Sequence, residues 1–264
     1  MSDAKIEIPR LAPGAIRRRH AESLLPRFGD DGADALGTLV CAPPGFGKTT
    51  VLSRWAREHG TGSVAWLDVD SADDPALLCA GMLAAVTRTV TMGRRNPLPD
   101  LRVGADTIVA HLVDLVDIVE RHEKPVWLVL DGLDRFRHPD ALQIPELLVR
   151  RARRRLRLVL STRHYPATGL RYLRMAGLLR EIRAGDLAFT AEETTQLLAN
   201  HDVQLGDDDL GRLMAVTEGW PAAVGMAAAA LAAAADQRST LDELVGDRLT
   251  HHCAAAGSPP RPGC

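Results

Sequence analysis

The residues best suited to chemistry form one short stretch, Ala42-Pro43-Pro44-Gly45-Phe46-Gly47-Lys48-Thr49-Thr50. It follows the apolar residues 37–41 and precedes residues 51–57, whose apolar side chains recur at helical spacing. A strand, a glycine-containing loop and a Gly-Lys-Thr sequence that starts a helix are the context that a phosphate-binding P-loop needs. The backbone N–H groups of such a loop converge on one point, where the helix dipole adds positive charge. The stretch therefore predicts a nucleotide site, with an ordinary Gly/Pro loop as the alternative.

Individual residues of this loop have separate expected roles. Gly45 and Gly47 carry no Cβ atom, so the backbone can turn sharply and approach phosphates closely. The ammonium group of Lys48 is expected to reach the β- and γ-phosphates, and the hydroxyl group of Thr49 is expected to bind Mg²⁺. The first position of the pattern is Ala42 in place of glycine.

A second candidate group lies at the end of residues 125–131, the most apolar run of the chain. An unbroken apolar run is typical of a parallel strand that is covered on both faces. Its last residue, Asp131, would emerge at the carboxyl edge of the sheet, where α/β proteins bind ligands, and would hold Mg²⁺. Asp134 lies on the following turn and could polarise an attacking water or complete the metal shell. Alone, the pattern fits an Asp-Gly turn equally well; downstream of a P-loop it favours a Walker B strand.

Arginine residues provide two further candidates. Residues 156–163 are predicted to form a strand that ends at the same edge, where Arg163 could sense a γ-phosphate through two hydrogen bonds. By position alone, a surface arginine at a strand end explains Arg163 better. The arginine-rich residues 150–155 suggest contacts with nucleic acid, but the last turn of a helix, where cations suit the dipole, explains them better.

Composition and periodicity predict the domain organisation. The 264 residues, 46% hydrophobic and 25% charged, are enough for one large or two modest domains. We expect a leader at 1–36 with a basic helix over 16–28, a P-loop nucleotide-binding domain at 37–186, a small helical domain at 187–248 and a disordered tail at 249–264. The predicted fold class is α/β, with a parallel five-stranded sheet followed by a small all-α domain.

Local signals predict where the helices begin and end. Asp74 and Pro75 start a helix that runs to about residue 86, and residues 105–122 form an amphipathic helix. Thr190 and Glu193 have the spacing of a capping box and open a helix to about Ala199. A helix over 208–216 and an alanine-rich helix from Pro221 to about Asp236 follow.

Charge, cysteine spacing and hydropathy argue against a nucleic-acid-capturing, a metal-binding, a secreted or a membrane-spanning protein. The formal net charge of -2 argues against electrostatic capture of nucleic acid by the molecule as a whole. The four cysteines are scattered, and adjacent residues such as His251, His252 and Cys253 lack productive metal-ligand spacing. The polar start and the short alanine-rich run at 222–235 predict neither a signal peptide nor a membrane span, so a cytoplasmic location is expected.

Taken in order, several stretches resemble the N-terminal part of the STAND class of signal-transduction P-loop ATPases. Within that class the chain is most similar to the MalT-like large ATP-binding LuxR-type transcription regulators. The matching stretches span about residues 5–235, and besides the P-loop they are 8–11, 16–18, 64–68, 73–75, the strand that ends in Asp131, 161–163, 186–190 and 218–221.

The resemblance implies an ATP/ADP-binding regulatory switch with Mg²⁺, and at most slow hydrolysis of ATP. Pro221 matches the GxP element of the class, whose proline packs on adenine. Arg163 matches the sensor arginine, and Arg18 matches an arginine of an N-terminal element that lies beside the base. The resemblance also places the strand of Arg163 between the P-loop strand and the Walker B strand.

The chain departs from this family in two respects. Asp131-Gly132-Leu133-Asp134 is closer to the NACHT branch of the class than to the usual Asp-Asp, and Arg135 stands where NACHT proteins commonly have glutamate. Such regulators continue into a winged helix, a helical-repeat sensor and a helix-turn-helix. The chain is therefore expected to be a truncated or fragmentary member with no specific DNA binding of its own, whose partners are the nucleotide, the missing domains or a second copy.

Two other functions stay open at this point. One is a NACHT-like STAND ATPase with another output domain. The other is a small-molecule P-loop kinase, which would need an arginine-bearing lid and an acceptor site that the helical segment does not evidently supply.

Overall fold

The structure is a computed structural model, and it describes residues 3–27, 35–58, 62–70, 74–91, 108–136, 143–151, 155–165 and 170–248. The chain forms two compact units. The first comprises residues 1–10, 24–41 and 52–182, and the second comprises residues 11–23, 42–51 and 183–264. The P-loop stretch therefore belongs to the same unit as the C-terminal helices. The predicted tail at 249–264 lies outside the described residues.

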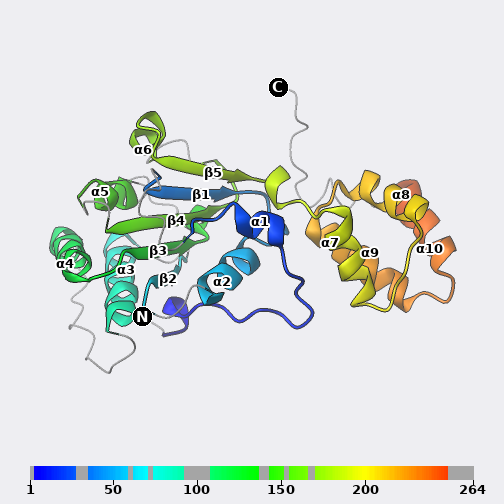
Figure 1. The fold of residues 1–264 in the computed structure, drawn as a ribbon, viewed down its shortest axis with the longest axis horizontal. Coiled ribbons are helices and arrows are strands. Elements are labelled where there is room, and N and C mark those ends of the chain that lie inside the picture. The colour runs from blue at the N-terminus through cyan, green and yellow to red at the C-terminus, as the bar shows by residue number, and fades with distance from the viewer. Residues whose placement is uncertain are drawn as a thin grey trace. The chain divides into compact units, whose positions relative to one another are not determined.

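The first unit is built on a five-stranded sheet with the strand order β2-β3-β4-β1-β5 (Figure 1). The strands are β1 (Gly37–Cys41), β2 (Val64–Asp68), β3 (Val126–Asp131), β4 (Leu156–Thr162) and β5 (Leu179–Arg183). Strand β4 pairs in parallel with both β1 and β3, and β2 pairs in parallel with β3. The predicted α/β class and five-stranded sheet are confirmed, and β4 lies between β1 and β3 as the resemblance implies.

Both faces of the central strands are covered by helices. Leu128 and Leu130 of β3 belong to an apolar core that also contains residues of α3 (Pro75–Val90), α4 (Ile108–Arg121) and α5 (Gln143–Arg151). Trp127 faces the opposite side of the sheet and meets Trp55 of α2 (Lys48–Glu58), with ring centroids 5.8 Å apart and planes at 88°. Burial on both sides explains why β3 is apolar from Val126 to Leu130.

Helix α3 of the first unit starts where its cap predicts. The Asp74 carboxylate accepts a hydrogen bond from the Leu77 N–H at 2.7 Å, and Pro75 occupies the first turn of α3. Helix α3 continues to Val90, one turn beyond the prediction. Helix α5 ends at Arg151, as expected for the basic run, although residues 152–154 lie outside the described part. None of the described helices is long and apolar enough to cross a membrane.

The leader is less helical than predicted. Besides the short turn η1 (Asp3–Ile6), its helix α1 covers only Arg19–Ser23, so the predicted helix over 16–28 is wrong across most of its described length. Ile16 is instead buried against the apolar side chains of the second unit. Pro26 disfavours the helical conformation of the residue before it, which ends the helix on the other side. Tertiary burial on one flank and proline on the other therefore override the local helical preference.

The second unit contains α7 (Ala191–Ala199), α8 (Asp207–Thr217), α9 (Pro221–Ala233) and α10 (Gln237–Glu243), followed by a π-helical turn. The predicted capping box is present, because Thr190 Oγ1 accepts from the Glu193 N–H at 3.1 Å and Glu193 Oε2 accepts from the Thr190 N–H at 3.2 Å. Helix α9 ends at Ala233, earlier than the predicted Asp236. Asp236 instead caps α10.

Candidate functional site

The P-loop stretch has the backbone that phosphate binding requires. Gly45 and Gly47 have φ angles of 82° and 72°, in the left-handed region that favours glycine. Helix α2 begins directly behind them at Lys48, so Thr49 and Thr50 lie in its first turn. The N–H groups of a first helical turn have no carbonyl partner within the helix, which makes this turn suited to an anion. The Lys48 ammonium donates to the carbonyls of Ala42 at 2.5 Å and Pro43 at 3.1 Å.

The loop packs against the start of α9, within the second unit. Trp220 Nε1 donates to the Pro44 carbonyl at 3.1 Å, and the Ala222 N–H donates to the Gly45 carbonyl at 3.1 Å. A Cβ atom on Gly45 would lie 2.6 Å from the Ala222 Cβ and 2.7 Å from Trp220 Nε1. Glycine is therefore required at position 45 both by its φ angle and because Trp220 and Ala222 leave no room for a Cβ atom. The contact between Trp220 and the loop was not predicted, because the sequence only placed Trp220 inside the Gly-Trp-Pro element.

Arg18 is a buried residue whose side chain is bonded to the protein. Only 4% of it is exposed, and its Nε donates to Glu193 Oε2 at 3.1 Å. Its Nη2 donates to the carbonyls of Leu187 at 2.6 Å and Ala188 at 3.2 Å, and its guanidinium lies 4.4 Å from the centre of the Phe189 ring. Burial lowers the pKa of the Arg18 guanidinium, and the charge of Glu193 opposes that shift.

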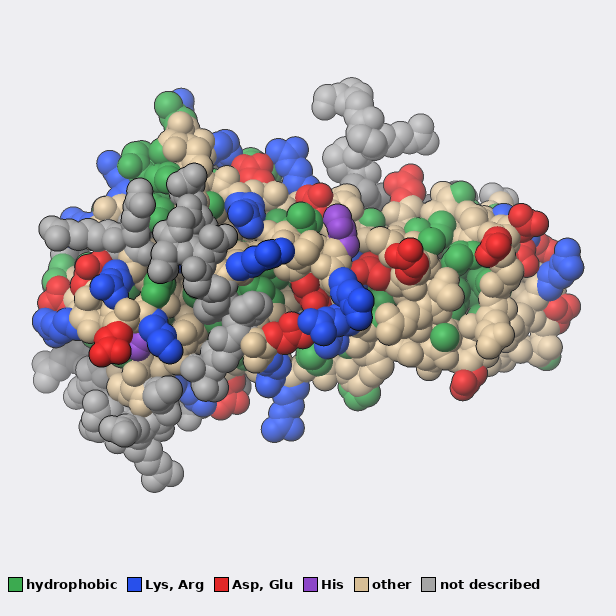
Figure 2. Space-filling model, in the orientation of Figure 1, with side chains coloured by type: hydrophobic (Ala, Val, Ile, Leu, Met, Phe, Trp, Pro, Cys, Tyr) green, Lys and Arg blue, Asp and Glu red, His purple; other side chains and the backbone are tan. Residues whose placement is uncertain are grey.

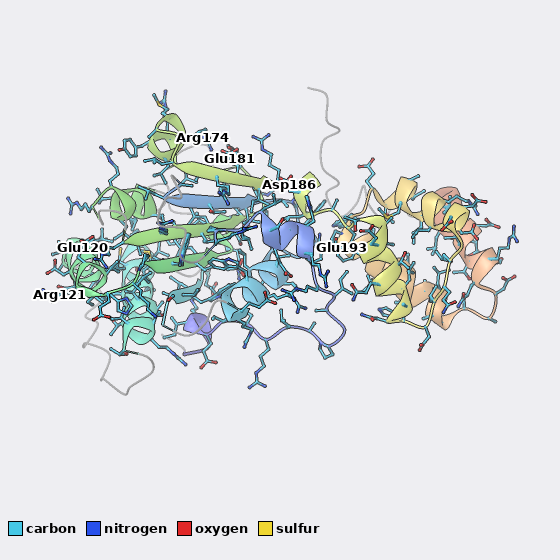
Figure 3. The ribbon with its side chains drawn as sticks, viewed as in Figure 1. Glu120, Arg121, Arg174, Glu181, Asp186 and Glu193 are labelled. Carbon is cyan, nitrogen blue, oxygen red and sulfur yellow. The ribbon has the colours of Figure 1, made fainter. Side chains whose placement is uncertain are left out.

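Glu193 is the third residue of α7, labelled in Figure 3, and its carboxylate both completes the capping box and holds Arg18. The Nη1 atom of Arg18 lies 3.7 Å from the position that a Cβ on Gly47 would occupy. The structure therefore places Arg18 between the first turn of α7 and the P-loop, and Pro221 at the first position of α9.

The Walker B candidate Asp131 ends β3 and is 3% exposed. The Ser161 hydroxyl group on the neighbouring strand β4 donates to Asp131 Oδ1 and accepts from the Gly132 N–H at 2.9 Å. This buried serine fixes the orientation of the carboxylate. In the sequence, Ser161 was noted only as part of a matching Ser-Thr-Arg stretch. The expected strand order puts the strand of Ser161 next to the strand of Asp131, and this signal could have identified Ser161 as a partner of the carboxylate.

The other two predicted residues of this edge form an ion pair. The Arg163 N–H donates to Asp134 Oδ1 at 2.9 Å, and Arg163 Nε lies 3.3 Å from Asp134 Oδ2. The Asp134 side chain is 11% exposed and that of Arg163 is 50% exposed. Beside them, Arg135 Nη2 donates to Asp68 Oδ1 at 2.5 Å. Each acid at the carboxyl ends of β2 and β3 thus has a polar partner from the same unit.

The structure groups the predicted site residues into two sets. In the first unit it brings Asp131, Asp134 and Arg163 to one edge of the sheet. In the second unit it brings the loop, Arg18 and the start of α9 together. Among the described residues, no cluster of three or more His, Cys, Asp or Glu side chains is placed to hold a metal ion by itself.

Comparison with known proteins identifies the fold. No protein-family profile matches the chain. The Walker-type ATPase PABY2304 of Pyrococcus abyssi matches with a TM-score of 0.54 and 10% identity, over 86% of this chain and 70% of that one. C. elegans PCH-2 matches with a TM-score of 0.45 and 12% identity, over 89% of this chain and 66% of that one. A chain of the structure of Drosophila ORC bound to AT-rich DNA and Cdc6 matches with a TM-score of 0.38 and 17% identity, over 86% of this chain and 82% of that one. The match to the Pyrococcus abyssi ATPase shows that the chain has the fold of a P-loop ATPase.

Proposed function

We propose that the chain is an ATP/ADP-binding regulatory module, similar to the ATPase part of MalT-like LuxR-type regulators. The observation that carries this proposal is the loop from Ala42 to Thr50, with its two left-handed glycines and α2 beginning at Lys48. Loop amides and the positive end of the α2 dipole would bind the phosphates. Lys48, whose ammonium group bonds to carbonyls of the loop itself, would supply the principal cation.

The residues present fit a nucleotide-bound Mg²⁺. This ion usually keeps several waters and takes one or two protein ligands plus phosphate oxygens, so no preformed cluster of acids is needed. Of the two predicted ligands, Asp131 of the first unit is buried and oriented by Ser161, and Thr49 of the second unit lies in the first turn of α2. The ion would neutralise charge on the phosphate oxygens.

The acids around Asp131 support a switch rather than a fast catalyst. Asp134, the candidate for polarising water, is engaged by both the backbone and the side chain of Arg163. Arg135, at the position where NACHT proteins commonly have glutamate, carries a positive charge and pairs with Asp68. At most slow hydrolysis is therefore proposed, which would reset a conformational equilibrium. The sequence Asp131-Gly132-Leu133-Asp134 also keeps a NACHT-like STAND ATPase with another output as the alternative.

The test is calorimetric titration of the Lys48→Ala variant with ATP and with ADP. Removing the ammonium group should cost roughly 2–5 kcal/mol, by analogy with truncating a buried charge pair. That cost corresponds to a loss of about 30-fold or more in affinity for both nucleotides. The matched control is Lys124→Ala, which removes an exposed lysine of the first unit. This variant should bind ATP and ADP as tightly as the parent. A Lys48→Ala variant that binds as tightly as the parent would show that the loop is not a nucleotide site.

A further inference from the structure

The contact between α9 and the P-loop runs through two carbonyls of the loop. Trp220 Nε1 donates to the Pro44 carbonyl and the Ala222 N–H donates to the Gly45 carbonyl, both at 3.1 Å. In a planar trans peptide, the C=O of one residue and the N–H of the next point in opposite directions. The N–H groups of Gly45 and Phe46, which share these two peptide planes, therefore point away from α9.

These two amides are a large share of the donors that the loop can offer. Pro43 and Pro44 have no N–H group, so the donors between them and α2 are the amides of Gly45, Phe46 and Gly47. Two of the three are oriented by the contact with α9. The backbone hydrogen bonds of a P-loop are what hold the phosphates, so the direction of these amides decides how well the loop binds.

The backbone of Trp220 is itself firmly held. Its N–H donates to the Thr217 carbonyl at 2.8 Å, and the Gly219 carbonyl accepts from the Phe189 N–H at 2.7 Å. Gly219 has a φ angle of 71°, and a Cβ atom there would lie 2.5 Å from the Phe189 carbonyl oxygen. The indole ring also lies near Phe46, with centroids 6.5 Å apart. The turn before α9 is thus a fixed support for the indole.

We infer that Trp220 is a positioning residue for nucleotide binding, which aims the Gly45 and Phe46 amides at the β-phosphate of a nucleoside di- or triphosphate. This inference rests on the proposed function and deepens it. The indole N–H acts through the Pro44 carbonyl, so Trp220 differs in role from Pro221, which the family resemblance implies packs on adenine. The hydrogen bonds from Trp220 and Ala222 to the loop also make the start of α9 sensitive to the conformation of the loop.

The experiment compares two tryptophan variants that lose the same kind of hydrogen bond. Trp220→Phe keeps an aromatic ring and removes the donor to Pro44. Trp55→Phe removes the donor to the Pro26 carbonyl at 2.9 Å, a contact of the first unit outside the loop. Losing one neutral hydrogen bond should lower the ADP affinity of Trp220→Phe by about five- to tenfold. Trp55→Phe should bind ADP like the parent, and urea unfolding of each variant reports whether it folds.

The second readout is AMP, measured by competition, because AMP lacks the β-phosphate. Trp220→Phe should lose ADP affinity and retain AMP affinity, and Gly45→Ala, whose added Cβ would push against Trp220, should shift the same ratio further. Equal losses for ADP and AMP, or an unchanged ADP affinity, would overturn the positioning role while leaving Lys48-dependent binding intact. If the parent binds no nucleotide, the proposed function fails and this inference fails with it.

Discussion

Replacing Arg18 by methionine should strongly destabilise the second unit. The side chains of Arg18 and Glu193 are only 5% and 10% exposed, and they meet at 3.1 Å. Methionine removes the cation and leaves a buried carboxylate whose remaining partner is the Thr190 N–H. It also removes the donor that serves the Leu187 carbonyl at 2.6 Å.

The expected magnitude follows from this burial. Removing one partner of a buried ion pair costs about 3–5 kcal/mol, because the other charge stays buried and uncompensated. A domain is stable by only about 5–15 kcal/mol, so this loss is a large share of the free energy of unfolding. The exposed pair Arg121–Asp117, with side chains 78% and 55% exposed, provides the contrast; Arg121 is labelled in Figure 3. Arg121→Met should cost about 0.5 kcal/mol or less.

The assay is urea unfolding followed by circular dichroism, applied to a double-mutant cycle. Glu193→Gln keeps the capping geometry but removes the charge, and the Arg18→Met/Glu193→Gln variant closes the cycle. A hydrogen-bonded charge pair should give a coupling energy of about 1.5–3 kcal/mol. A coupling below about 0.5 kcal/mol, or an Arg18→Met cost no larger than that of Arg121→Met, would refute the reasoning.

Two further predictions concern ligands. Asp131→Asn should weaken Mg²⁺-dependent ATP binding more than metal-free ADP binding in calorimetry, because the carboxylate acts through the metal; equal losses would indicate a folding defect. The chain should show no sequence-specific DNA binding when promoter fragments and scrambled duplexes are titrated at physiological salt. Its net charge is -2, and acidic and basic side chains are interspersed on the face shown in Figure 2. Tight binding that prefers one sequence would contradict this.

The sequence by itself determined the features that depend on neighbours along the chain. The strand before Ala42 and the helix that starts at Lys48 follow from apolar spacing and from two glycines in one loop. The capping box of Thr190 and Glu193 was likewise predictable, because its two hydrogen bonds join residues three positions apart. The strand order required the family resemblance, because pairing partners are far apart in sequence.

Only the tertiary structure decided which distant residues meet. Arg18 and Glu193 are 175 positions apart, and their pairing, together with the burial of Ile16, ended the predicted leader helix at its N-terminal side. Trp220 lies 176 positions from Pro44, and no local pattern links an indole N–H to a loop carbonyl. Such contacts depend on how the elements pack, because burial and hydrogen bonding between segments outweigh the small local preferences of each one.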